Sequence, residues 1–572
     1  MASHDGAGAR RQADFVRGPA LAVAGGGLRG SAVPTGITSG LLAAAHGMRP
    51  SEGPPTLQGT GIYARFASVA SVSGGSWFCA SLIYSEGFVQ LVEDMAASPA
   101  DAERLFQSRW TTPWLATTDV DSPCVKLFAW LAKQSGAAWL SQDILSIGYL
   151  WKTGKTWTNF TLNMFQSTAG IDMSTVLGSP PRPWAKGKAW LIGHVLTTPS
   201  LQDKHHVELC EQAMPQRSIT QYVSGSPGLS VFTPAIYSFV LGSDDAQAPV
   251  PYVAACALPP ASLWHYEGTV QSVSRWCCGG AEERYASKAP TNCFSNVERG
   301  ARDLPVVSCA AASSAAAGVQ TILNARHALS VDTAGGDFAV WQGSGPAGES
   351  FERAANQVRR ANAPGGVDQA ALDGLAGGAV RAAIDGGNAD PIGIASAVRA
   401  GAREVVAYLN TNASDTPTDL SVLFTGGSAP FAPKAHPIFS DTADDMMTKY
   451  AKFPKIKKCP GASFLKAISV GTLVVTTVDN DLWGIPGHIV VTLHLIGVAS
   501  SVTMGGTEDL HDYGTLVREV AQAFAAPNNA DLVRGTVMPW FLGDPTPASE
   551  APTDAPGSHS ASEAETERAS DA

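Results

Sequence analysis

The chain has 572 residues, of which 45% are hydrophobic and 16% charged, and its formal net charge is -11. This composition allows a large buried core, and the negative charge argues against a general nucleic-acid-binding protein. No uninterrupted apolar run reaches the ~18 residues that a membrane span needs. The 9 cysteines are irregularly spaced, with no CxxC pair. We therefore expect a reduced, intracellular protein with ordinary thiols, the alternative being a metal cluster at Cys277, Cys278 and Cys293.

The first patterned segment is Gly18–Leu42, GPALAVAGGGLRGSAVPTGITSGLL. Its apolar start predicts a short buried strand, and the residues after the glycines predict a helix with Pro34 near its beginning. Backbone N–H groups point at an anion when a strand, a glycine loop and a helix follow one another. Gly36 and Gly40 lie four residues apart, so we expect this helix to approach a neighbour closely along that face.

The glycine loop fits an oxyanion hole better than a nucleotide site. GGGLRG departs from the GxGxxG pattern, no acidic residue follows before Glu52, and the GK[ST] of a Walker loop is absent. An oxyanion hole needs only adjacent N–H donors, which consecutive glycines can turn inward. The alternative is a tight turn without chemistry.

A second strand–turn–helix unit follows in RFASVASVSGGSWFCASLIYS. The stretch Ser71–Gly75 approximates the G-x-S-x-G nucleophile elbow, with Ser71 at the first glycine position and Ser73 as the candidate nucleophile. The simpler interpretation is that Ser73 only caps the following helix. Two such units in succession favour the nucleophile.

The candidate acid lies in GAVRAAIDGGNADPIGIASAVRAGAREVVAYLN, which predicts a parallel strand–turn–helix–strand unit. Asp385 stands at the carboxyl end of its first strand, where open parallel sheets gather their sites. Asp385 could also merely cap the next helix. Asp332 precedes glycines too, but only the glycines after Asp385 lead into a helix and a further strand. Among late histidines, His511 is the candidate base of a Ser-His-Asp arrangement.

These motifs together resemble the catalytic domain of cytosolic phospholipases A2 and fungal-type lysophospholipases, within the patatin-like acyl hydrolases. GGGLRG, SVSGGSW, and DGG followed by NADPIGIASAVRAGA carry the resemblance most strongly. Weaker likeness at Ser230–Ser243 and in TVDNDLWGIPGHIVVTLHLI extends it over about residues 18–500. The resemblance implies a three-layer α/β fold with a largely parallel central sheet and a large cap-like insertion.

The implied domain organisation is a catalytic domain over residues 18–540, with the cap region at about 90–330. Residues 1–17 would form an N-terminal tail. Residues 545–572 are acidic and lack aromatic and branched aliphatic side chains, so we expect a disordered tail there.

The resemblance also assigns roles. Ser73 matches the nucleophile and Asp385 the acid of a Ser-Asp dyad. Gly26 and Gly27 match the oxyanion donors, and Arg29 matches an arginine that faces the substrate phosphate. The implied enzyme hydrolyses fatty-acyl esters of phospholipids or lysophospholipids without a metal or other cofactor. It would be cytoplasmic and would dock transiently on membrane surfaces.

Two departures from the family pattern keep alternatives open. Ser71 replaces the usual glycine before the nucleophile, and the loop Pro50–Gly61 lengthens the path from Arg29 to Ser73. One alternative is a catalytically inactive lipid-binding relative. Another is an α/β-hydrolase esterase that pairs Ser73 with His511.

Two further features bear on lipid access. Eight of the tryptophans in the expected cap region would suit either an apolar lid or an ordinary core: Trp110, Trp114, Trp130, Trp139, Trp151, Trp157, Trp184 and Trp190. The segment Lys449–Cys459, KYAKFPKIKKC, mixes lysines with Tyr450, Phe453 and Ile456. It would suit docking to an anionic membrane or a solvated charged surface.

Overall fold

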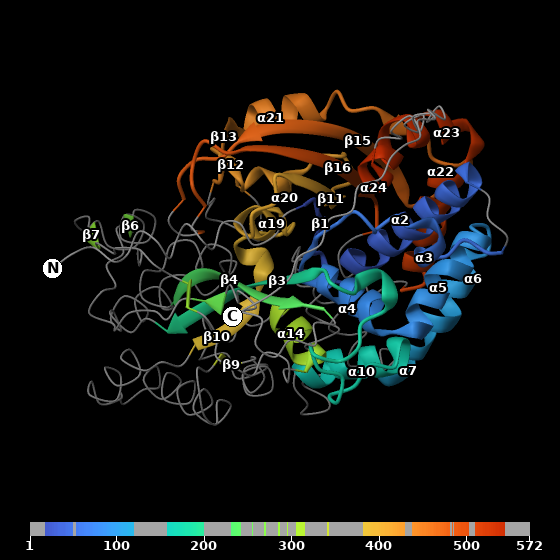
Figure 1. The fold of residues 1–572 in the computed structure, drawn as a ribbon, viewed down its shortest axis with the longest axis horizontal. Helices are drawn as coiled ribbons and strands as arrows, with labels where there is room; N and C mark the ends of the chain where they lie inside the picture. The colour runs from blue at the N-terminus through green and yellow to red at the C-terminus, as the bar shows by residue number, and fades with distance from the viewer. Residues whose placement is uncertain are drawn as a thin grey trace, which may run out of the picture.

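The computed structural model is drawn in Figure 1. It describes residues 18–49, 53–118, 157–199, 230–241, 305–314, 381–428, 437–480, 483, 485–502 and 510–543, with the short strands 254–255, 268–269, 284–285, 294–295 and 340–341. The two expected tails, and Asp332, lie outside these residues.

The described residues form an α/β fold around a 10-stranded mixed sheet with the order β14-β15-β16-β11-β1-β2-β3-β10-β9, in which β4 also pairs with β3 (Figure 1). The strands are β1 (Ala20–Val23), β2 (Ser68–Val72), β3 (Ala189–Pro199), β4 (Ser230–Val240), β9 (Val340–Trp341), β10 (Arg381–Asp385), β11 (Glu404–Thr411), β14 (Lys455–Ile456), β15 (Leu465–Thr476) and β16 (Val490–Ser500). The central run from β16 to β3 is parallel, and the pairings outside it are antiparallel. The expected largely parallel central sheet is therefore present in the run from β16 to β3, and the strands outside that run are antiparallel.

Helices and short strands complete the described parts. The helices are α2 (Gly27–Met48), α3 (Leu57–Thr60), α4 (Gly74–Tyr84), α5 (Glu86–Ala97), α6 (Ala102–Phe106), α7 (Thr112–Thr118), α10 (Trp157–Ala169), α14 (Val306–Ser313), α19 (Ile394–Arg399), α20 (Thr418–Ser421), α21 (Ala443–Tyr450), α22 (Asp512–Ala525), α23 (Ala530–Leu532) and α24 (Met538–Leu542). The remaining strands are β5 (Ala254–Ala255), β6 (Gly268–Thr269), β7 (Arg284–Tyr285), β8 (Phe294–Ser295), β12 (Phe424–Thr425) and β13 (Phe439–Thr442). None of the helices in these parts of the chain is both long and apolar enough to cross a membrane.

The central strands are covered on both faces. Every residue of β1 and β2 is buried, as expected for a parallel strand between two helical layers. Ser71 Oγ contacts Ser76 in α4 at 3.0 Å, whereas a Cβ built on Gly393, just before α19, would lie 3.6 Å from Ala70 Cβ. Successive strand residues face opposite sides, so α4 and α19 cover opposite faces of β2. Figure 1 shows α2, α4, α5 and α22 on one side of β1 and α19 on the other.

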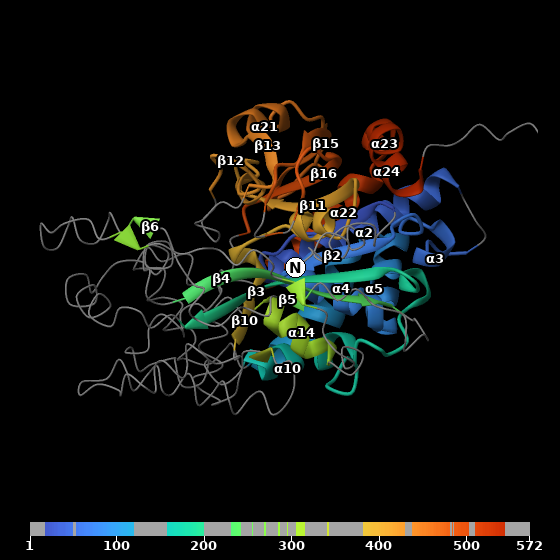
Figure 2. The same ribbon diagram turned by 60° about the vertical axis from the view of Figure 1, so that its left-hand side comes forward.

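The expected close approach along α2 is confirmed, and its partner is α22. A Cβ on Gly36 would lie 2.9 Å from the carbonyl oxygen of Val517, and one on Gly40 would lie 2.6 Å from Phe524 Cβ. The two helices lie side by side in both ribbon views (Figures 1 and 2). The face of α2 that carries Gly36 and Gly40 packs against α22, and this contact fixes the position of α2 and of the glycine loop at its start.

The expected parallel unit around Asp385 is wrong in one respect. The order of strand, turn, helix and strand is correct, from β10 through α19 to β11. However, β10 pairs antiparallel with β3 and is not a neighbour of β11. The reason is that β4 occupies one edge of β3 along its whole length, so β10 must take the free end of the other edge.

The region expected to form a cap, about residues 90–330, contributes directly to this core. It supplies β3 and β4 to the sheet and α14 beside them. Trp110, Trp114 and Trp190 are almost fully buried, which supports an ordinary core for these three. Trp130, Trp139 and Trp151 lie outside the described residues.

The lysine-rich segment Lys449–Cys459 packs its apolar side chains inward. Tyr450 and Ile456 are buried, and Phe453 lies against Gly471 of β15. Lys449 pairs with Asp441 at 2.8 Å, and Lys455 pairs with Asp415 at 2.8 Å. This packing favours a solvated charged surface, because none of the three apolar groups is presented to a membrane.

Candidate active site

Ser73 occupies a strained elbow between β2 and α4. Its backbone has φ 51° and ψ -129°, and a positive φ is uncommon for a residue with a side chain. The side chain makes no capping hydrogen bond to α4. Its Oγ instead donates to Oδ2 of Asp385 at 2.8 Å. The interpretation of Ser73 as a simple helix cap is therefore wrong.

Glycines make this sharp turn possible. A Cβ on Gly74 would lie 1.9 Å from the carbonyl oxygen of Gly27, and one on Gly75 would lie 2.5 Å from that of Val23. Real side chains do not tolerate such contacts, so the start of α4 can only pack against the start of α2 and the end of β1 when both positions are glycine. The two strand–glycine–helix units of the sequence are thus in direct contact.

Asp385 reaches Ser73 because β2 and β10 meet end to end. Both strands pair with the same edge of β3: Val72 is opposite Gly193, and Asp385 is opposite the next residue, His194. Asp385 as a whole residue is only 7% exposed. While Oδ2 accepts from Ser73, Oδ1 accepts from the N–H of Gly387 at 2.7 Å. Asp385 therefore caps the following short helix through Oδ1 and pairs with Ser73 through Oδ2 at the same time.

The environment of Asp385 raises its proton affinity. Burial raises the pKa of this carboxyl to about 6, although the hydrogen bonds from Gly387 and Ser73 act in the opposite direction. A carboxylate with this pKa is a stronger base than an exposed aspartate and is still ionised at neutral pH.

The glycine loop lies directly against the nucleophile. A Cβ on Gly25 would lie 2.8 Å from Ser73 Cβ. Gly26 and Gly27 have φ values of 118° and 57°, which favour glycine. Among the described residues, no acceptor lies within hydrogen-bond distance of the Gly26 or Gly27 N–H. The N–H groups of the two amides expected to form an oxyanion hole can therefore donate hydrogen bonds to a substrate oxygen.

Asp390 fixes the segment that links the acid to this loop. Its buried carboxylate accepts hydrogen bonds from the N–H groups of Ile392, Gly393 and Ser396 at 3.0–3.2 Å. Burial raises its pKa to about 6, and the three amides oppose that shift. The carbonyl of Pro391 then accepts from the Gly25 N–H at 2.9 Å. The segment after Asp385 is thus tied to the loop before Arg29.

A chain of buried hydroxyls lies beneath the elbow and accounts for Ser71. The indole N–H of Trp190 donates to Ser71 Oγ at 2.9 Å. Ser71 Oγ contacts Ser76 Oγ at 3.0 Å, Ser76 contacts Ser313 Oγ at 2.9 Å, and Ser313 donates to the carbonyl of Gly193 at 2.6 Å. Each hydroxyl has one proton, so the chain runs in one direction from the indole to the carbonyl. The departure from glycine at position 71 supplies one member of this chain.

The same chain holds the nucleophile's backbone. The N–H of Ser73 is within hydrogen-bond distance of both Ser313 Oγ, at 3.0 Å, and the Ser313 carbonyl, at 3.2 Å. Ser313 is at the end of α14, far from Ser73 in sequence. We did not identify it from the sequence, because an isolated serine in VVSCAAASS carries no local signal.

Arg29 lies in the first turn of α2 and is 8% exposed. Its Nη1 donates to the carbonyl of Thr411 at 3.4 Å, and its Nε is buried with no acceptor among the described residues. Burial lowers the pKa of the guanidinium, and the nearby Asp419 opposes this shift. No carboxylate in the described ranges lies within 4.0 Å of the guanidinium.

His511, the candidate base of the alternative Ser-His-Asp arrangement, does not join this site. His511 is exposed and precedes α22, where its carbonyl accepts from Gln107 at 3.2 Å. Cys277, Cys278 and Cys293 lie outside the described residues. The part of the chain that is described contains no group of three or more His, Cys, Asp or Glu residues placed to hold a metal.

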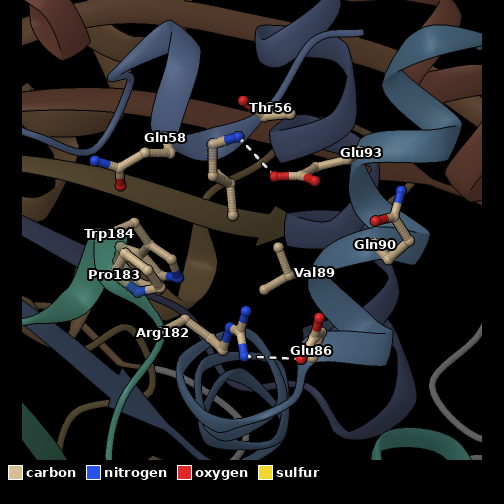
Figure 3. Close-up of a pocket in the computed structure, with 10 residues that line it drawn as sticks. Thr56, Gln58, Glu86, Val89, Gln90, Glu93, Arg182, Pro183 and Trp184 are labelled. Carbon is tan, nitrogen blue, oxygen red and sulfur yellow. Dashed lines mark hydrogen bonds and ion pairs between the residues drawn. The ribbon is translucent and has the colours of Figure 1, made fainter.

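A separate pocket of about 260 Å³ opens between α3, α5 and the turn before β3 (Figure 3). Trp184 and Val89 lie across it from one another, and Arg182 pairs with Glu86 at its rim at 3.2 Å. It is placed near the amino ends of β2 and β3, because α3 and Trp184 precede those strands. Ser73 follows the carboxyl end of β2, so this pocket is not part of the candidate active site.

No protein-family model matches this chain, and no curated protein sequence matches it significantly.

Proposed function

We propose that this protein is a serine acyl hydrolase that works through a Ser73–Asp385 dyad. The observation that carries the proposal is the 2.8 Å hydrogen bond from Ser73 Oγ to a buried carboxylate, made at a strained elbow. The adjacent loop offers two open backbone amides. Nucleophile, base and oxyanion donors are the parts that acyl transfer needs.

The reaction begins with attack of Ser73 Oγ on the ester carbonyl carbon. The hydroxyl proton passes to Asp385 Oδ2, and the carbonyl oxygen gains negative charge, which the Gly26 and Gly27 amides stabilise. The C–O bond to the alcohol then breaks, and the leaving oxygen takes the proton from Asp385. Water attacks the acyl-enzyme, Asp385 accepts the water's proton, and the serine is regenerated when that proton returns to Oγ.

The substrate class rests on the motif resemblance and on Arg29. The GGGLRG, SVSGGSW and DGG motifs resemble those of phospholipases A2 and lysophospholipases, which cleave fatty-acyl esters. Arg29 follows the glycine loop at the start of a long helix, where an anionic headgroup would be favoured. We therefore propose phospholipids or lysophospholipids as substrates, reached by transient docking of a cytoplasmic enzyme on membranes. The patatin-like fold and a lipid-covering cap belong to the same proposal.

The decisive experiment is a hydrolysis assay over a panel of phospholipids, lysophospholipids and neutral esters. Ser73→Ala should abolish hydrolysis and labelling by a fluorophosphonate probe while circular dichroism remains that of the wild type. Asp385→Asn should also be inactive, whereas His511→Ala should retain activity. Full probe labelling of Ser73→Ala, or loss of activity in His511→Ala alone, would overturn the dyad.

A further inference from the structure

We infer that Asn410 is a positioning residue for the oxyanion hole, because it orients the peptide that carries the Gly26 N–H. The inference rests on the proposed acyl transfer but concerns a residue outside the three motifs. Asn410 lies near the end of β11 and is 8% exposed. Its Nδ2 donates to the carbonyl oxygen of Gly25 at 2.7 Å.

The direction of this hydrogen bond fixes the direction of the next amide. In a planar trans peptide the carbonyl and the N–H point to opposite sides. The sheet order is β11-β1-β2, and Gly25 follows the end of β1. A Gly25 carbonyl drawn toward Asn410 on the β11 side therefore sends the Gly26 N–H toward the β2 side. Ser73 lies on that side, directly after β2.

A glycine loop needs such an anchor because its own backbone prefers no single conformation. Gly25, Gly26 and Gly27 have no side chains to restrict rotation of the peptides between them. The Gly25 N–H is held by the Pro391 carbonyl, but that contact fixes the peptide before Gly25 and not the one after it. Within the described parts of the chain, the hydrogen bond from Asn410 is the one that restrains the Gly25–Gly26 peptide.

The other half of the Asn410 amide indicates that the donor is what the site requires. Its Oδ1 is buried with no hydrogen-bond partner in the described parts of the chain. Leaving a buried carbonyl oxygen unsatisfied costs free energy, which an apolar side chain at this position would avoid. The hydrogen bond that Asn410 donates to the Gly25 carbonyl offsets part of that cost, and an apolar side chain could not donate it.

The kinetic test uses Asn410→Leu, which removes the donor without adding charge, and Asn410→Asp, which keeps the shape. We expect kcat on an ester to fall roughly 10- to 100-fold, approaching the effect of removing one oxyanion donor, with KM changed less than about threefold. The kcat on the matching thionoester should fall much less, because its sulfur is a weak hydrogen-bond acceptor and gains little from the oxyanion donors. The ratio of ester to thionoester turnover should therefore fall in both variants.

Asn529→Asp is the matched control. Asn529 is also a buried amide, and its Nδ2 donates to the carbonyls of Lys457 and Ala523 at 2.8 Å, away from the dyad. This variant should lose thermal stability but keep the wild-type ester to thionoester ratio. An unchanged ratio in both Asn410 variants would overturn the inference.

A structural readout separates this inference from the proposed function. In a crystal structure of Asn410→Leu, the Gly25–Gly26 peptide should be rotated or should occupy more than one orientation. A single, unrotated peptide in that variant would overturn the role of Asn410, whatever the activity of the protein. Absence of Ser73-dependent hydrolysis in the wild type, together with a rotated peptide in the variant, would instead reject acyl transfer and leave the anchoring role in place.

Discussion

The backbone N–H of Ser73 is shared between the hydroxyl and the carbonyl of Ser313, at 3.0 and 3.2 Å. Ser313 ends α14, which packs against α4, β3 and β10. One residue of the long segment between nucleophile and acid therefore holds the elbow through the backbone N–H of Ser73. A positive φ at Ser73 persists only if surrounding contacts enforce it, and this shared hydrogen bond is one such contact.

We predict that Ser313→Ala slows acyl transfer roughly tenfold in kcat, because the Ser73 N–H loses one of its two acceptors and Ser73 Oγ is less well aligned with Asp385. The substitution should also cost about 1–2 kcal/mol of unfolding free energy, since Ser76 loses its acceptor. Steady-state kinetics and denaturant unfolding measure the two effects.

Ser314→Ala is the control for that prediction. Ser314 is buried in the next position, where it accepts from the Trp77 indole at 2.9 Å and donates to the Ala310 carbonyl at 2.7 Å. The Ser314→Ala variant should be destabilised to a similar extent as Ser313→Ala, while its kcat stays near that of the wild type. Equal kinetic losses in the two variants would mean that Ser313 serves only the stability of the fold.

The buried carboxyl of Asp385 predicts a pH dependence of both activity and stability. The base must be ionised, so kcat/KM should rise with pH through about 6, the raised pKa of this group. Between about pH 4 and 6 the folded protein binds more protons at this position than the unfolded chain, whose carboxyl has the ordinary value of 3.8. The contribution of Asp385 to stability therefore falls as pH rises through this window.

Asp385→Asn tests both consequences. It should reduce kcat at least ~10³-fold, as expected for loss of a general base. The free energy of unfolding of the variant minus that of the wild type should be larger at pH 7 than at pH 4, by on the order of 2 kcal/mol. Melting curves of both proteins at the two pH values provide the measurement. A stability difference that is the same at both pH values would contradict the assigned pKa.

The sequence predicts those parts of the site that depend on local backbone chemistry. The glycines around Ser73 and before Arg29 are recognisable because only glycine allows the close contacts with Gly27 and Val23. The approach of α2 to α22 is predictable for the same reason, from the spacing of Gly36 and Gly40.

Contacts that depend on distant chain segments are not predictable in this way. The position of β10 in the sheet depends on how β4 and β2 occupy the edges of β3, and no local pattern encodes this position or the antiparallel direction of the strand. Asn410 and Ser313 act through hydrogen bonds to distant segments, and the sequences around them are those of an ordinary strand and an ordinary small-residue helix. The inward packing of Tyr450 and Ile456 likewise depends on the sheet beside them rather than on their own segment.

The last prediction concerns Arg29, whose guanidinium is mostly buried near the glycine loop. If it binds the phosphate of the substrate, a lysine should replace it poorly, because a point charge cannot make the two parallel hydrogen bonds of a guanidinium. We predict that Arg29→Lys loses roughly 10- to 100-fold in phospholipid hydrolysis, the value of one or two charge-assisted hydrogen bonds. It should retain most hydrolysis of an uncharged p-nitrophenyl acyl ester, and the ratio of the two rates is the measurement.

Asp419→Asn separates this role from a structural one. Asp419 is the carboxylate whose charge acts on Arg29, and burial raises its own pKa to about 6 while Arg29 opposes that shift. If Arg29 is present for the substrate, Asp419→Asn should leave the ratio of phospholipid to neutral-ester hydrolysis close to that of the wild type. If the guanidinium and this carboxylate instead hold the fold together, both variants should lose thermal stability in parallel. Arg29→Lys should then lose hydrolysis of the phospholipid and of the neutral ester equally. Arg29 would in that case stabilise the fold and would not bind the substrate phosphate.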